Sequence, residues 1–156
     1  MPRLLGSILL ALVLNATPAT AQNRDDIRFA ETGDLVGAWE VVPYPPGAAG
    51  PFEYLVILGT GRIGTLTATE RRAGLTQREM MRMIDPITPN AFQMSDGKMT
   101  IFYSRIPGLR EIWAVHMVTR DFSGGGVQHR VGDAIMLRDD GQGGITRSRH
   151  LRKLPD

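Results

Sequence analysis

The sequence predicts an all-β domain, either a sandwich or a barrel, with about eight strands and one short helix. Short runs of β-branched and aromatic residues recur along the chain, and clusters of Gly, Pro, Asn and Asp separate them. One segment alone has the spacing of an amphipathic helix. The strands are expected at 35–42, 52–58, 62–69, 91–94, 99–104, 110–119, 133–138 and 145–154.

The first strands are joined by a loop and a glycine-rich turn. Residues 43–51 (PYPPGAAGP) cannot sustain a strand, because proline lacks the N–H that a ladder needs. Gly59, Gly61 and Gly64 spell G-x-G-x-x-G, which holds a dinucleotide only where a helix follows it. The alternating threonines of 65–69 indicate a strand instead, so we expect a hairpin turn.

The helix is expected to begin after Thr76 and to end before Pro86. Thr76 and Glu79 have capping-box spacing, and Met80, Met81 and Met83 follow at helical spacing. Such methionines favour a helix that covers a sheet or a barrel end. An adaptable lid over a ligand is the alternative, since methionine tolerates different apolar shapes.

The N-terminal segment is typical of a cleaved secretory signal. Residues 1–21 contain one early positive charge, an apolar run too short to span a bilayer, and a final Ala-Thr-Ala. We therefore expect Gln22 to be the first mature residue, 22–34 to form a lead-in, and 35–156 to form the domain. The expected location is the periplasm or outside the cell, without stable membrane insertion.

Composition excludes some function classes. Removing 1–21 takes away one of the 18 basic side chains and none of the 16 acidic ones, so the mature charges nearly balance. A nucleic-acid partner is not expected, because nucleic-acid proteins are strongly basic. The chain has no cysteine, and disulfides therefore do not stabilise it.

Part of the chain resembles bacterial lipocalin-like domains. The stretch 35–72 has G-x-W in its first strand (Gly37, Trp39), a Pro/Gly loop, an aromatic strand, a turn and a further strand. The turn reads Thr60-Gly61-Arg62 where the family usually has Asp-Gly-Arg. This resemblance implies a small eight-stranded antiparallel up-and-down barrel of the lipocalin/calycin type.

Barrel closure is the first role that the resemblance implies. We expect Gly37 to leave space for Trp39, and Trp39 to be buried at the closed end. An arginine from the last strand, here Arg149 rather than Arg147, is expected to lie across the indole.

No catalytic or metal site can be assembled from the sequence. His116, His129 and His150 fall on separate elements without the pair spacing of metal ligands, and no cysteine nucleophile or paired carboxylates are present. No enzymatic activity, metal or cofactor is therefore expected.

Two hypotheses for function remain open. In the first, the barrel interior binds a small hydrophobic ligand that enters at the end carrying 43–51. The expected ligand-binding residues are Tyr44, Phe52, Tyr54, Val56, Tyr103, Trp113, Val115 and Met117. In the second, side chains fill the barrel, and its outer surface binds an envelope protein as an interaction or inhibitor module. Strands 52–58 and 110–119 are apolar on both faces, so the inward positions are not fixed by the pattern.

Overall fold

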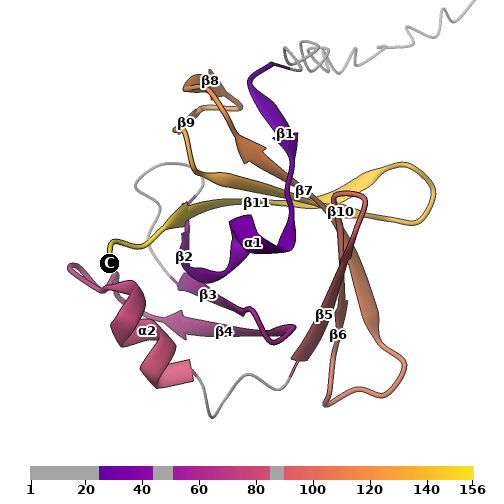
Figure 1. The fold of residues 1–156 in the computed structure, drawn as a ribbon, viewed down its shortest axis with the longest axis horizontal. Coiled ribbons are helices and arrows are strands. Elements are labelled where there is room, and N and C mark those ends of the chain that lie inside the picture. Colours follow the sequence, from indigo (N-terminus) through magenta and orange to yellow (C-terminus); the bar gives the residue numbers. More distant parts are fainter. Residues whose placement is uncertain (1–24, 44–50, 85–89) are drawn as a thin grey trace, which may run out of the picture.

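The computed structural model describes residues 25–43, 51–84 and 90–156, and these segments form mostly β-sheet (Figure 1). The elements, in chain order, are β1 (Ile27–Phe29), α1 (Thr32–Leu35), β2 (Gly37–Val41), β3 (Phe52–Leu58), β4 (Arg62–Ala68), α2 (Gln77–Ile84), β5 (Asn90–Ser95), β6 (Lys98–Phe102), β7 (Arg110–Val118), β8 (Phe122–Gly124), β9 (Val127–His129), β10 (Ala134–Asp139) and β11 (Ile145–Lys153).

Eight of the described strands close into an antiparallel barrel. Each of β2 to β6 pairs with the next strand in sequence, β7 pairs with β10, and β10 pairs with β11. The ring closes where β11 pairs with β2, with Lys153 opposite Trp39. The predicted all-β, up-and-down barrel is confirmed. The structure contains a second helix, α1, in addition to the single helix that was expected.

The segment 22–34, expected only as a lead-in, contributes two elements to the barrel. β1 pairs with residues 116–118, at the C-terminal end of β7. It lies along the same edge of β7 that pairs with β6 at residues 110–114. The short helix α1 lies in the middle of the ring of strands in Figure 1, and its Leu35 is fully buried. The carbonyl of Leu35 accepts a 2.8 Å hydrogen bond from the indole Nε1 of Trp39. The N-terminal segment therefore covers one end of the barrel.

A small hairpin lies between β7 and β10, at residues where no strand was expected from the sequence. β8 and β9 pair in register and are joined by Gly125 and Gly126, whose φ angles are +59° and +77°. Two consecutive positive φ angles belong to the tight turn that suits the twist of a hairpin, and glycine adopts them without strain. The run of glycines thus encodes a turn here.

Two hydrophobic clusters lie on opposite faces of the barrel wall. The interior cluster contains Trp39, Leu55, Ile57, Trp113, Val115, Met117 and Leu151 among its buried members. The outer cluster lies under α2 and contains Ala38, Tyr54, Val56, Met80 and Leu154, with Phe52, Met81 and Met83 packed against it. The prediction that Tyr54 and Val56 face inward is wrong. α2 buries the outer face of β3, and the inward positions on this strand are Leu55 and Ile57.

The turn and the helix cap follow the sequence prediction. Arg62 pairs with Leu58, so Gly59 to Gly61 form the β3–β4 hairpin turn, with Gly61 at φ +80°. At the start of α2, the Glu79 carboxylate accepts the Thr76 backbone N–H at 2.9 Å. The methionines of α2 cover the barrel wall, as favoured above. Among the described helices, none has both the length and the apolarity that a membrane span requires.

Candidate functional site

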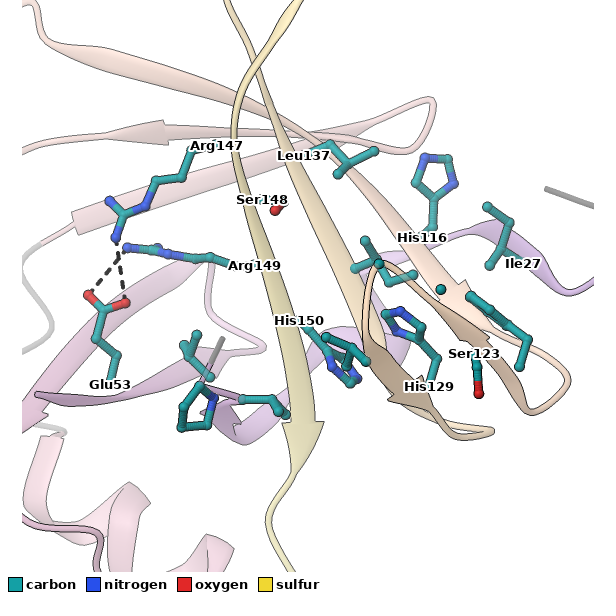
Figure 2. Close-up of a pocket in the computed structure, with 18 of the residues that line it drawn as sticks. Ile27, Glu53, His116, Ser123, His129, Leu137, Arg147, Ser148, Arg149 and His150 are labelled. Carbon is teal, nitrogen blue, oxygen red and sulfur yellow. Dashed lines mark hydrogen bonds and ion pairs between the residues drawn. The ribbon is translucent and has the colours of Figure 1, made fainter. Parts of the chain in front are cut away.

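A pocket of about 820 Å³ lies against β10 and β11, and we call it the side pocket. Ile135, Leu137, Ser148 and His150 supply its wall on these strands, while the β8–β9 hairpin covers it through Phe122, Ser123, Gly124, Gly125, Val127 and His129. Figure 2 shows lining residues on both sides of β11. Among the described residues, the pairing of β11 with β2 ends at the hydrogen bond that the backbone N–H of Val42 donates to the carbonyl of His150. The two parts of the pocket therefore lie on either side of an edge of β11.

All three histidines of the chain line the side pocket. Strand register explains two of them: Ile135 is opposite His116 on β7 and opposite His150 on β11. His129 comes from β9, and its ring lies 4.4 Å from that of His150, centroid to centroid. On its other side His129 stacks on Phe122 at 4.5 Å. The barrel and its hairpin thus gather residues that are far apart in sequence.

A buried carboxylate holds His150 in place. Asp133 Oδ2 lies 2.7 Å from His150 Nε2 and also accepts hydrogen bonds from Arg152 and from the backbone N–H of Arg130. Burial alone would raise the pKa of Asp133, but the hydrogen bonds from His150 and Arg152 lower it to about 2. The carboxylate is therefore ionised and accepts the Nε2 proton. The Nδ1 atom of His150 remains without a partner among the described residues.

The second buried histidine, His129, is held mainly by ring contacts. Its Nδ1 atom also has no hydrogen-bond partner among the described residues. Burial, and then the neighbouring His150, lower the pKa of His129. Burial likewise lowers the pKa of His116, which stacks on Phe29 at 5.0 Å. Burial therefore favours the neutral form of both rings.

At the other side of β11 the pocket meets a group of charges, Glu53, Arg147 and Arg149, which we call the rim cluster. Both guanidinium groups approach the one Glu53 carboxylate, at 3.7 Å from Arg147 and 3.5 Å from Arg149 (Figure 2). The side chain of Arg149 is only 11% exposed, and it lies 5.1 Å over the ring of Trp113. Burial lowers the pKa of Arg149, against the attraction of Glu53.

None of the seven described residues among the eight expected to bind a ligand lines the side pocket. Tyr44 lies outside the described residues, and Phe52, Tyr54 and Val56 pack on the α2 side of β3. Trp113, Val115 and Met117 face inward as predicted, but with Tyr103 they pack into the interior cluster. The side pocket lies near loop 43–51, because Val42, Pro43 and Pro51, at the two ends of that loop, border it.

Trp39 is fully buried, as expected, but the cation over it is wrongly predicted. Lys153 Nζ lies 5.3 Å from the indole, because the β11–β2 register places these residues opposite each other. Arg149 comes four residues earlier, about 13 Å along the strand, where it meets Trp113. A Cβ on Gly37 would lie 2.6 Å from Gln77 of α2, and φ is +137°. Gly37 thus makes room for α2 rather than for the indole.

We expect the free energy of unfolding to fall as the pH drops below 6.5. A histidine whose pKa is lower in the folded chain than its ordinary 6.5 binds fewer protons when folded. Its contribution is therefore complete above pH 6.5 and is lost as the pH falls through that value toward the folded pKa. Urea unfolding followed by tryptophan fluorescence at pH 7.5, 6 and 5 measures the slope.

The variant His129→Phe keeps a ring against Phe122 and removes one titrating group. It should show a shallower pH dependence than the wild type over the same range. An equal slope in the two proteins would contradict the role assigned to His129.

Within the described residues, no group of three or more His, Asp and Glu side chains is arranged to hold a metal ion. No protein-family model matches the chain, and comparisons with characterised proteins and with solved structures also give no match.

Proposed function

We propose that this protein is an exported, lipocalin-like barrel that binds a small molecule in the side pocket, around the edge of β11, rather than in the packed centre of the barrel. The observation that carries the proposal is the pocket of about 820 Å³ against β10 and β11. Pockets that enclose small ligands are typically about 300–1,000 Å³, and they combine apolar walls with a few polar groups. Ile135 and Leu137 supply an apolar wall, and the histidines supply polar atoms.

The buried nitrogens of the pocket support binding of a ligand with polar groups. Nδ1 of His129 and Nδ1 of His150 have no partner among the described residues, although both side chains are 8% exposed. A buried polar atom without a partner is unfavourable by about 1–3 kcal/mol. A ligand whose binding brings a polar group to these two atoms, which are closed off from the pocket in this structure, would gain that energy, while its apolar part contacts Leu137.

The interior of the barrel is the less favoured place for a ligand. Trp39, Leu55 and Trp113 are fully buried in one continuous cluster that spans inward positions of three strands. Side chains commonly fill the centre of an eight-stranded barrel. A ligand there would have to displace packed residues, whereas the side pocket needs no such displacement.

Fluorescence titration with the neutral probe N-phenyl-1-naphthylamine tests the proposal. We expect saturable binding with one site per chain. The variant Leu137→Trp should weaken it by about tenfold, because an indole would occupy space against β10. The matched control is Ile112→Trp, which places the same ring on the outer face of β7 and away from the pocket. Equal binding by the two variants would place the ligand elsewhere.

A second function is favoured by a separate observation. The hairpin of β6 and β7 exposes four large apolar side chains, Phe102, Ile106, Leu109 and Ile112. Apolar groups gathered on one surface are typical of protein-interaction sites. A stable protein that shows no saturable probe binding would favour this interaction module of the outer surface.

A further inference from the structure

We infer that the ligand of the side pocket is an organic monoanion, whose charged group lies against Arg147 and Arg149 and whose apolar part contacts Ile135 and Leu137. This inference rests on the proposed function, and it follows from the charges around one end of β11.

Positive charge exceeds negative charge within the group of side chains that are linked to Glu53 and Glu111 by ion pairs. Three arginines, Arg138, Arg147 and Arg149, lie with two glutamates, Glu53 and Glu111, among the described residues. Arg138 and Arg147 are directly opposite each other across β10 and β11. Like charges in that position repel.

Glu111 is already engaged with other partners. Its carboxylate forms an ion pair with Arg138 at 3.1 Å and accepts hydrogen bonds from the Tyr103 hydroxyl and the Trp113 indole. Burial, and then the hydrogen bond to Glu111, raise the pKa of Tyr103 to about 12, so its hydroxyl stays neutral. Arg147 and Arg149 are therefore left to share Glu53, at distances longer than those of strong ion pairs.

Arg149 is the residue that most needs an anion. Its side chain is 11% exposed, and its Nε atom has no partner among the described residues. A buried charge that is incompletely paired is unfavourable. The contact with Trp113 compensates for part of this, since a cation over an indole is stabilised. A monoanion bound beside Glu53 would neutralise the excess charge.

The placement of the lining residues suits a ligand with two different ends. Figure 2 shows Arg147, Arg149 and Glu53 on one side of β11, and Leu137 and His116 on the other. Each of these residues lines the same pocket. A ligand whose anionic group lies at the rim cluster can therefore place its apolar part past the edge of β11, against β10.

Two fluorescent probes that differ by one charged group test the inference. 8-Anilinonaphthalene-1-sulfonate has the ring system of N-phenyl-1-naphthylamine and one added sulfonate. The wild-type protein should bind the sulfonate probe about tenfold more tightly than the neutral one, because charge-assisted hydrogen bonds form only with the anion. Arg149→Met should reduce this preference to near unity.

Two further variants complete the design. Arg147→Gln changes a side chain that is 53% exposed, so it keeps the test usable if Arg149→Met does not fold. It should reduce the preference for the sulfonate several-fold. Arg110→Gln, an exposed arginine that does not line the pocket, should leave the preference unchanged.

The outcomes separate this inference from the proposed function. If the wild type binds the two probes with equal affinity and Leu137→Trp weakens both, the inference of an anionic ligand is overturned, while the pocket remains a binding site. A preference for the sulfonate that persists in both rim variants would also overturn it. Absence of saturable binding by either probe would overturn the proposed function, and the inference with it.

Discussion

Replacing Trp39 by alanine is expected to lower the free energy of unfolding by about 3–5 kcal/mol, as large-to-small changes in a core do. The indole is fully buried, donates to the Leu35 carbonyl at 2.8 Å and lies under Lys153. The variant loses interior packing and the link between the barrel and α1 together. Urea unfolding at pH 7.5, followed by circular dichroism, measures the change.

The control for this prediction is Val131→Ala, because Val131 is 64% exposed. Its effect should stay within about 0.5 kcal/mol, as for other surface changes. An unfolding curve of Trp39→Ala that coincides with the wild-type curve would show that the indole is not part of the packed core.

Replacing Asp133 by asparagine is expected to lower the free energy of unfolding by about 3 kcal/mol or more. Asp133 is 3% exposed, and its carboxylate accepts hydrogen bonds from His150, Arg152 and the backbone of Arg130. Removing its charge leaves a partly buried arginine without its ion pair, and breaking a buried pair is unfavourable by about 3–5 kcal/mol.

The effect of Asp133→Asn should be largest near the β8–β9 hairpin, because Arg152 also donates to the Gln128 carbonyl at 3.1 Å. Hydrogen exchange of the amides in 122–129 should therefore accelerate more than that of β3. Glu70→Gln, a neutralised carboxylate at an exposed position, provides the matched control. Equal stability of the two variants would contradict the assigned network.

The fold could be predicted because its local patterns agree with one another. The hairpin at Gly59–Gly61 and the cap at Thr76 depend on neighbours in sequence, and both form as expected. For β3, the sequence could not predict which side chains face the barrel interior. Tyr54 and Leu55 are equally apolar and both fully buried, so the alternation that normally fixes the faces is absent.

The candidate site was missed because it depends on register between distant segments. The β10–β11 turn could have placed His150 opposite Ile135, since hairpin register follows from the turn. His116 reaches the same row only through the β7–β10 pairing, across a long connection that contains its own hairpin. The contact of Lys153 with Trp39 was missed for the same reason, because the pairing of β11 with β2 joins the two ends of the domain.

The pairing of β11 with β2 also determines the order in which the barrel can be completed. The other barrel contacts join strands that follow one another among the barrel strands, whereas this seam joins Trp39 to Lys153 across nearly the whole domain. Closing so long a stretch of chain is entropically unfavourable, so the seam forms after the shorter pairings. Leu154 N then bonds to the Ala38 carbonyl, and Gln77 N to that of Pro155. The first residue of α2 thus bonds to the segment that follows β11, and the barrel can close only when the chain as far as Lys153 is available to pair with β2.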